Sequence, residues 1–411
     1  MPEHTDTPGP NAMFGQNVQR VRERNGQTRA VVGGLIGRSA EWVKAIEKGR
    51  LGVPRLPLLL RLADVLGLRD LAELTGDERL TAVSYSKAAH TALPAVKEAL
   101  TTYQFNGTDE EPETVDSLRA RVRQAWQLWH GIGEHRTNVA AVLPDLLADL
   151  RHAARVHEGV GRRRVLVALA ETYHLAQLYL SFQPVPELVM LTGDRAMTAA
   201  QDADSPRAIA VAAWYMNHVF RDAGERHEAR VDLAMKAADL IRQGDTPEDL
   251  ARRGLLQLAA SLSYAKIGRK GDAERFWDQA ESTAKRLGSG YAHPYLIFGQ
   301  GMVDAYAITM NADLVRSGAA VESAEAVDVT PMPSATRRSF HMIESARAYS
   351  MQREPVAVVH LLKKAHEESP ETARFNIFAR SAVADLAETG PATVRGDARF
   401  LRQEMGLSVA A

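Results

Sequence analysis

The sequence predicts an all-α protein, with a small five-helix domain at the N-terminus followed by an α-solenoid of paired helices. Apolar residues recur at helical spacing over most of the 411 residues, and no segment alternates with the period of two that marks strands. Two segments, Trp214–Ile241 and Ser261–Leu287, also align with each other at an offset of 44 residues. A chain of this length exceeds what one hydrophobic core organises, so two or more domains are expected.

Two short helices joined by a tight turn form the centre of the N-terminal domain. Gly37 ends the first helix, because glycine adopts a positive φ at the least cost. Ser39 caps the second helix, which Gly49 ends. The apolar faces of the two helices consist of Val31, Val32, Leu35, Ile36, Val43 and Ile46. This arrangement is typical of the helix-turn-helix motif, whose second helix enters the DNA major groove.

The segment Phe14–Leu74 resembles the Cro/phage-repressor (XRE) type of helix-turn-helix domain. The matching residues are Gly26, Gln27, Thr28, Gly37, Ser39, Trp42, Val43, Ile46, Glu47, Lys48 and Gly49, followed by PRLPLLLRLADVLGL. The expected first helix is Phe14–Arg24, the fourth follows Pro54, and the fifth is Leu68–Leu74. One position departs from the family: Arg29 stands where the second helix commonly begins with Gln, and a guanidinium donates hydrogen bonds but accepts none.

Charge is distributed unevenly along the chain. Within Phe14–Leu74, eleven basic and six acidic residues leave +5, so the rest of the chain, whose total is −1, carries −6. A small basic domain on a mildly acidic body is expected if only the small domain meets phosphates. We divide the chain into a disordered arm (1–13), the helix-turn-helix domain (14–76), a connector (77–116) and a helical repeat domain for sensing and dimerisation (117–411).

The connector is expected to contain a helix near Pro94–Thr102 and an exposed acidic loop, NGTDEEPET. Thr114 starts a helix that runs to about His130, and further helices follow to the end of the chain. In the repeated pairs an aromatic, a glycine and a small residue recur, since Phe220, Gly224 and Ala229 align with Tyr264, Gly268 and Ala273, and a third copy surrounds Tyr349.

This pattern resembles tetratricopeptide (TPR) repeats, which stack into a superhelix with a concave groove. The stretch that starts at Arg119, with Trp126, Trp129 and LPDLLADL, is similar to the middle of actinobacterial XRE regulators that carry a TPR tail. The first helix of each TPR pair lines the groove. The ligand-binding candidates that the resemblance implies are His174, Trp214, Asn217, Arg221, Tyr264, Tyr306 and His341.

For each of these candidates, packing between repeats is the competing interpretation, and it is favoured for the aromatic ones. Asn217 and Arg221 lie four residues apart, so they are expected to project from one helix face. There Asn217 would meet a peptide amide and Arg221 a carboxylate. The competing interpretation for this pair is a solvated surface.

The DNA-contacting candidates lie on and around the second helix of the motif. They are Arg29, Arg38, Ser39, Ala40, Glu41, Trp42, Lys44, Lys48 and Arg50. Lys44, with Ala40, Glu41 and Ala45, is expected to face away from the apolar stripe and to contact a base or phosphate, unless this face is merely solvated. Trp42 either packs in the domain core, which we favour, or lies against sugar and thymine methyl groups. Glu47 is expected to be structural, and the remaining basic residues are candidate phosphate contacts.

No catalytic or metal-binding constellation is present in the sequence. The absence of cysteine excludes disulfides, thiolate metal sites and cysteine nucleophiles. The pairs His130/His135 and His152/His157 lack the i, i+4 spacing of a helical metal site, GVGRRR lacks the ending of a phosphate-binding loop, and no GxSxG occurs. We therefore expect no enzymatic activity, no metal and no cofactor.

The resemblance implies a cytoplasmic, sequence-specific regulator of transcription. No stretch approaches the ~18 apolar residues of a membrane span, and the acidic N-terminus lacks the apolar core of a secretory signal. The expected partners are a double-stranded DNA operator, a peptide or small-molecule signal in the TPR groove, and a second copy of the chain, because two-fold operators match two-fold proteins. The alternative is a TPR interaction scaffold whose head is vestigial or binds protein.

Overall fold

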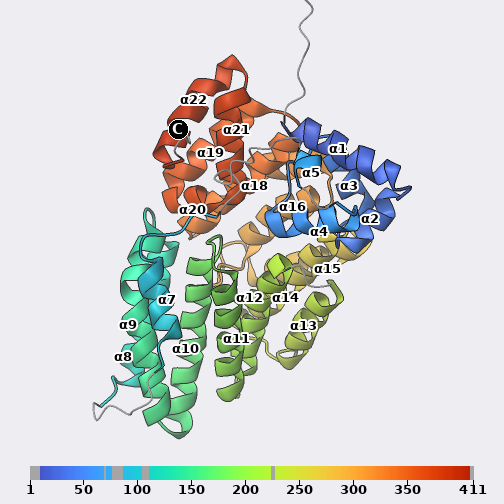
Figure 1. Cartoon of the computed structure of the whole chain (residues 1–411). Helices are drawn as coiled ribbons and strands as arrows, with labels where there is room; N and C mark the ends of the chain where they lie inside the picture. Colours follow the sequence, from blue (N-terminus) through green and yellow to red (C-terminus); the bar gives the residue numbers. More distant parts are fainter. Residues whose placement is uncertain (1–9, 69–70, 76–86, 104–110, 224–226, 408–411) are drawn as a thin grey trace, which may run out of the picture.

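The computed structural model describes residues 10–68, 71–75, 87–103, 111–223 and 227–407. All regular elements in these ranges are helices, which confirms the predicted all-α class. A small N-terminal domain, here called the head (residues 10–75), lies beside one edge of a larger array of helix pairs, here called the body (residues 87–407), as Figure 1 shows.

In its described residues the head consists of α1 (Pro10–Arg24), α2 (Arg29–Leu35), α3 (Ala40–Glu47), α4 (Leu56–Val65) and α5 (Ala72–Thr75). The hydroxyl groups of Thr28 and Ser39 cap α2 and α3, because each accepts a hydrogen bond from the backbone N–H three residues later. Gly37, in the turn between them, has a φ of 67°. The core consists of buried apolar side chains from α1 to α4, among them Phe14, Val18, Val32, Val43, Ile46, Leu62 and Leu66.

The first helix starts earlier than the sequence indicated. α1 begins at Pro10 rather than Phe14, so residues 10–13 of the expected disordered arm are helical, while residues 1–9 lie outside the described ranges. Proline suits the first turn of a helix because its missing N–H has no partner there anyway. This turn is also packed, since a Cβ added to Gly49 would lie 3.1 Å from the Cα of Ala12.

The fifth helix was also misplaced, because it spans Ala72–Thr75 and not Leu68–Leu74. Leu68 belongs to the end of α4 instead. Its N–H donates to the carbonyl oxygen of Ala63 at 2.8 Å, and Gly67 before it has a φ of 69°. This is the left-handed C-terminal cap that glycine permits at a helix end.

The body starts with the connector helix and continues as a succession of neighbouring helices. These are α7 (Leu93–Thr101), α8 (Val115–His130), α9 (His135–Val156), α10 (Gly159–Leu180), α11 (Pro186–Asp202), α12 (Pro206–Ala223), α13 (His227–Leu240), α14 (Pro247–Lys266), α15 (Lys270–Leu287), α16 (Gln300–Asp313), α17 (Ser317–Ala326), α18 (Ala335–Met351), α19 (Pro355–Glu368), α20 (Pro370–Phe375), α21 (Ile377–Thr389) and α22 (Ala392–Glu404). Helices adjacent in sequence pack against each other, for example α10 with α11, α14 with α15 and α18 with α19. The result is a repeat-like array of helix pairs.

Two successive pairs, α12 with α13 and α14 with α15, each have a hydrogen bond at the same place between their two helices. Ser261 on α14 donates to the carbonyl oxygen of Ala273 on α15 at 2.8 Å, and Asn217 on α12 donates to that of Arg230 on α13, also at 2.8 Å. Ala273 is buried at the helix crossing, as expected. Its predicted counterpart Ala229 is exposed, and Arg230 is buried in its place. The predicted alignment is therefore wrong by one residue in the second helix, because α13 starts 43 residues before α15 and not 44.

The last part of the body contacts its first helices: α18 packs against α8, and α20 lies at the N-terminal end of α9 (Figure 1). Near the end of α8, His130 bonds the hydroxyl group of Ser334 at 2.8 Å and the carbonyl oxygen of Tyr295 at 2.9 Å. On α20, Glu371 accepts a hydrogen bond from the hydroxyl group of Thr137 on α9 at 2.7 Å. Segments more than 150 residues apart thus hold the array together.

Candidate nucleic-acid interface

The helix expected to read DNA, α3, has one face fixed in the head core. Val43, Ala45 and Ile46 are inaccessible to solvent, whereas Glu41 is exposed and Lys44 half-buried. The prediction that Ala45 faces outward is therefore wrong. Lys44 lies 3.5 Å from the Glu41 carboxylate, with 44% of its side chain accessible, so it can exchange this weak surface pair for a phosphate or a base.

Glu47 connects the first three helices of the head. Its carboxylate is fully buried and lies 2.5 Å from Nε of Arg22 on α1 and 2.7 Å from Nε of Arg29 on α2. Arg22 also donates to the carbonyl oxygen of Gln27 at 2.9 Å, and its hydrogen bond with Glu47 is the main cause that raises the pKa of its guanidinium. Glu47 is thus structural. Arg29 is oriented by this pair, with 34% of its side chain still accessible at the start of α2.

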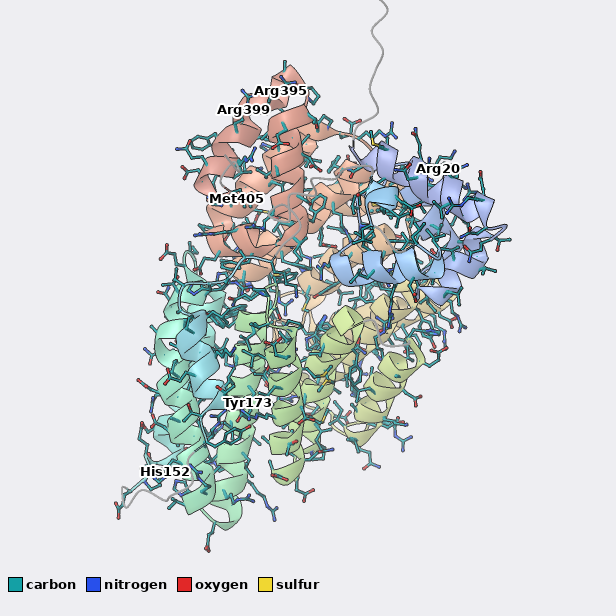
Figure 2. All side chains as sticks on the ribbon, in the orientation of Figure 1. Arg20, His152, Tyr173, Arg395, Arg399 and Met405 are labelled. Atoms are coloured by element: carbon teal, nitrogen blue, oxygen red, sulfur yellow. The ribbon has the colours of Figure 1, made fainter. Side chains whose placement is uncertain are left out.

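The other basic candidates lie at the two ends of α3. Arg38 donates to the carbonyl oxygen of Gly37 and places its guanidinium 5.9 Å from the centre of the Trp42 ring. Trp42 is half-buried and packs against the head core, which agrees with the interpretation we favoured. Lys48 is exposed and Arg50 half-buried just beyond the C-terminal end of α3. Arg20, on the outer side of α1 in Figure 2, adds to the basic surface of the head.

The body touches both ends of α3. At the N-terminal end, a Cβ added to Gly268 would lie only 2.4 Å from the Cβ of Ser39. At the C-terminal end, Nη2 of Arg353 donates to the carbonyl oxygen of Lys48 at 3.2 Å. Ser39 and Ala40 are half-buried.

Most of the predicted ligand-binding residues are packing residues. His174, Trp214, Tyr306 and His341 each expose 2% or less of their surface. His341 meets Tyr306 edge to face at 5.0 Å between ring centres, and Tyr306 meets Trp214 in the same manner at 6.4 Å. Tyr264 stacks on Phe276 at 5.7 Å. The competing interpretation, packing between helices, describes these residues in the structure.

Asn217 requires a correction as well. It does not project into a groove, because it is 5% exposed and its amide donates to the Arg230 carbonyl oxygen across the α12–α13 seam. Its carbonyl oxygen accepts from the hydroxyl group of Ser263 at 3.3 Å. The side chain of Arg221 lies outside the described residues. Helix phase, which sequence spacing alone does not fix, decides which of these faces is buried.

Two structural features of the body were not predicted from the sequence. The first is a cavity of about 820 Å³ between α7, α9, α10 and α11, whose apolar wall includes Leu166, Leu169 and Tyr173 (labelled in Figure 2). Its rim carries Arg151 and Arg195, which donate to the last carbonyl groups of α7 at 2.6 Å each. No local motif predicts a space between four helices, so this cavity could not be anticipated from the sequence.

The second feature is a set of buried histidines. Neither ring nitrogen of His174 or His341 has a hydrogen-bond partner among the described residues. Burial lowers the pKa of each to about 3, so both are neutral at pH 7. In the part of the chain that the structure describes, no three histidine, aspartate or glutamate side chains gather into a metal site, and no helix is long and apolar enough to cross a membrane.

Comparison with protein families agrees with the geometry of the head. Residues 14–75 match the family described as helix-turn-helix domain. The match covers the head and none of the body, so the class of protein that it defines is that of chains with an N-terminal helix-turn-helix domain. A search of curated proteins finds no match.

Proposed function

We propose that the protein is a DNA-binding regulator of transcription in which the head contacts DNA and the body receives a signal. The helix-turn-helix fold of residues 14–75 carries this proposal. Its support is a formal charge of +5 on Phe14–Leu74, together with Lys44 and Lys48 on the accessible side of α3. Insertion of α3 into the major groove places these side chains near base edges and phosphates.

The signal is a peptide or a small molecule, and the body is the part that takes it. The cavity between α7 and α11 has a size typical of small-molecule sites, about 300–1,000 Å³. This cavity has room for a ligand, whereas the aromatic candidates are buried side chains. Two copies of the chain pair on a two-fold operator, and the signal acts by changing the geometry of this dimer.

Salt-dependent binding of the full-length chain to random duplex DNA tests the proposal. The association constant should fall steeply between about 50 and 200 mM salt, with a slope of about −0.9 for each phosphate neutralised. Replacing Lys48 and Arg50 together by glutamate should weaken binding and flatten the slope. As a control, the same change at Lys236 and Lys285, two exposed lysines of the body, should leave both unchanged.

Binding that does not depend on salt, or that is lost equally in the control, would overturn the proposal. It would instead favour a scaffold whose head contacts protein. Sedimentation equilibrium with and without duplex measures the expected dimer, whose mass is twice the 45.0 kDa of the chain.

A further inference from the structure

One edge of the body carries a row of left-handed turns. Adjacent helices run in opposite directions, so every second turn falls on the same edge. The turns that follow α10, α14, α16 and α18 contain Phe182, Gly268, Val315 and Arg353, with φ values of 67°, 76°, 61° and 62°. Non-glycine residues seldom adopt this conformation, and for the β-branched Val315 it is a genuine outlier. Strain of this kind persists where the surroundings hold it, often at functional sites.

The head meets this edge at three of its turns, those after α10, α14 and α18. The guanidinium of Arg55 lies 5.7 Å from the centre of the Phe182 ring. Ser39 touches Gly268, where both the positive φ and the closeness of the Ser39 side chain exclude any residue larger than glycine. Arg353 donates to the carbonyl oxygen of Lys48.

A fourth contact is apolar. Leu51, three residues after Lys48, packs against a small cluster of the body formed by Ile308, Ala312, Ala320, Ala348 and Met351. Val315 flanks the same cluster. Leu51 is therefore shared between the head core and the body.

These contacts hold the recognition helix at both of its ends. Ser39 is the N-terminal cap of α3 and Lys48 its C-terminal cap. Reading of bases requires the N-terminal residues of α3 to enter a major groove about 12 Å wide. The turn at Gly268 lies directly against Ser39, beside the residues that would enter the groove. A DNA strand at this end of α3 would therefore compete with the body for the same space.

We propose that this edge of the body is a docking surface for the chain's own head, and that docking keeps the recognition helix from DNA until the head is released. This inference rests on the proposed function, since it concerns access to the same helix. The contacts suit a reversible association: a hydrogen bond to a carbonyl group, a cation–π contact and one apolar side chain each contribute little by themselves.

Variants on the body side test the docking without altering the head. Val315→Asn makes the apolar cluster that Leu51 packs against more polar, and Arg353→Gly removes the hydrogen bond to the Lys48 carbonyl oxygen. Both new residues tolerate a left-handed turn, so the turns themselves should keep their conformation. The double variant should bind random duplex about 5- to 150-fold more tightly than the wild type, the usual range for coupling between two sites. Asp204→Gly is the matched control, because Asp204, with a φ of 50°, lies in the exposed turn after α11 on the opposite edge.

A distance measurement separates docking from DNA affinity. Because the chain has no cysteine, Gln16→Cys on the head and Arg286→Cys on the body give two unique sites for fluorescent labels. The label distance should increase when duplex is added, and in the double variant it should already be increased without DNA.

Three results would overturn the inference. Equal, salt-dependent affinities of the wild type and the double variant would show that docking does not limit DNA binding, while the proposed function would stand. An unchanged label distance in the double variant would show that the edge does not hold the head. Absence of salt-dependent binding in both proteins would overturn the proposed function, and this inference with it.

Discussion

Glu371 caps the helix in which Arg136 is the second residue, although the two lie 235 positions apart. One carboxylate oxygen accepts the backbone N–H of Arg136 at 2.5 Å, and the same oxygen lies 3.3 Å from the N–H of Thr137. The residue before α9, Glu134, makes no side-chain cap of its own. The C-terminal part of the body thus supplies the negative charge that stabilises the N-terminal end of α9.

Removal of this long-range cap should destabilise the whole body. Glu371→Ala leaves the buried N–H of Arg136 and the part-buried N–H of Thr137 without this acceptor, so we expect a loss of about 1–3 kcal/mol in the free energy of unfolding. Glu371→Gln keeps one acceptor oxygen and should lose less. Urea denaturation measures both. Glu388→Ala, which breaks an exposed pair with Arg402, should stay within about 0.5 kcal/mol of the wild type; an equal loss in all three variants would contradict the capping role.

The seam between α12 and α13 should depend on Asn217. Asn217→Ala removes the buried hydrogen bond to the carbonyl oxygen of Arg230 across the seam, so a loss of about 0.5–1.5 kcal/mol in the free energy of unfolding is expected. Ser261→Ala, at the equivalent position of the next pair, should lose a similar amount. Asn138→Ala, the same kind of change at an exposed helical position, serves as the control and should be nearly neutral. A stable Asn217→Ala protein would restore a role for this side chain outside the seam.

Low pH should destabilise the protein, and His341 should account for part of the loss in the free energy of unfolding. Burial, assisted by the positive charge of Arg337, lowers the pKa of His341 to about 3 in the folded protein, whereas a histidine in the unfolded chain titrates near 6.5. The unfolded state therefore binds the proton first as the pH falls. The stability from this group is complete above pH ~6.5 and is lost below it, by up to about 1.4 kcal/mol per pH unit.

Denaturation curves from about pH 7.5 down to pH 5 measure this effect. His341→Gln removes the titrating group. The loss of unfolding free energy per pH unit should therefore become smaller by up to about 1.4 kcal/mol, the contribution of one proton. His360→Gln, at an exposed position, should leave the slope as it is. An unchanged slope in His341→Gln would mean that the imidazole reaches solvent before the chain unfolds.

Lys44 and Arg50 should affect DNA binding differently. Lys44 lies on the accessible side of α3, so Lys44→Ala should cost about 1–3 kcal/mol on a selected site and relax base preference. Arg50, beyond the end of the helix, should contact phosphate only. Arg50→Ala should weaken all sequences alike and reduce the salt slope by about one. Selection of binding sites from a random library compares the two, and equal, sequence-independent losses would show that Lys44 touches phosphate alone.

The sequence predicted those parts of the structure that depend on neighbours in the chain. Gly37 and Ser39 mark the ends of α2 and α3 because their conformations and caps are local. The helical class follows from the periodicity of apolar residues. The buried pair of Glu47 with Arg22 could be anticipated only as a structural role for Glu47, since its partner is 25 residues away.

The rest depended on tertiary contacts. Asn217 looked available for a ligand because sequence spacing does not fix the phase of a helix, and the carbonyl oxygen that its amide meets belongs to the next helix. In sequence, the turn at Gly268 looks like any turn between two paired helices. Nothing in it indicates that Ser39 of the head lies against this turn. Glu371 has no motif at all, because a cap supplied from another helix leaves no local pattern.

The turns at Phe182, Gly268 and Arg353 belong to every second helix pair along one edge of the body, so the pitch of the array sets their spacing. A small twist distributed evenly over the pairs displaces the first and the last of these turns in opposite directions relative to the middle one. A head that keeps its shape fits all three turns at one twist of the array only, so a change of twist would weaken the contacts at both outer turns at once. In the regulator proposed above, a signal that twists the array would therefore act on α3 without a continuous path of contacts between the two places.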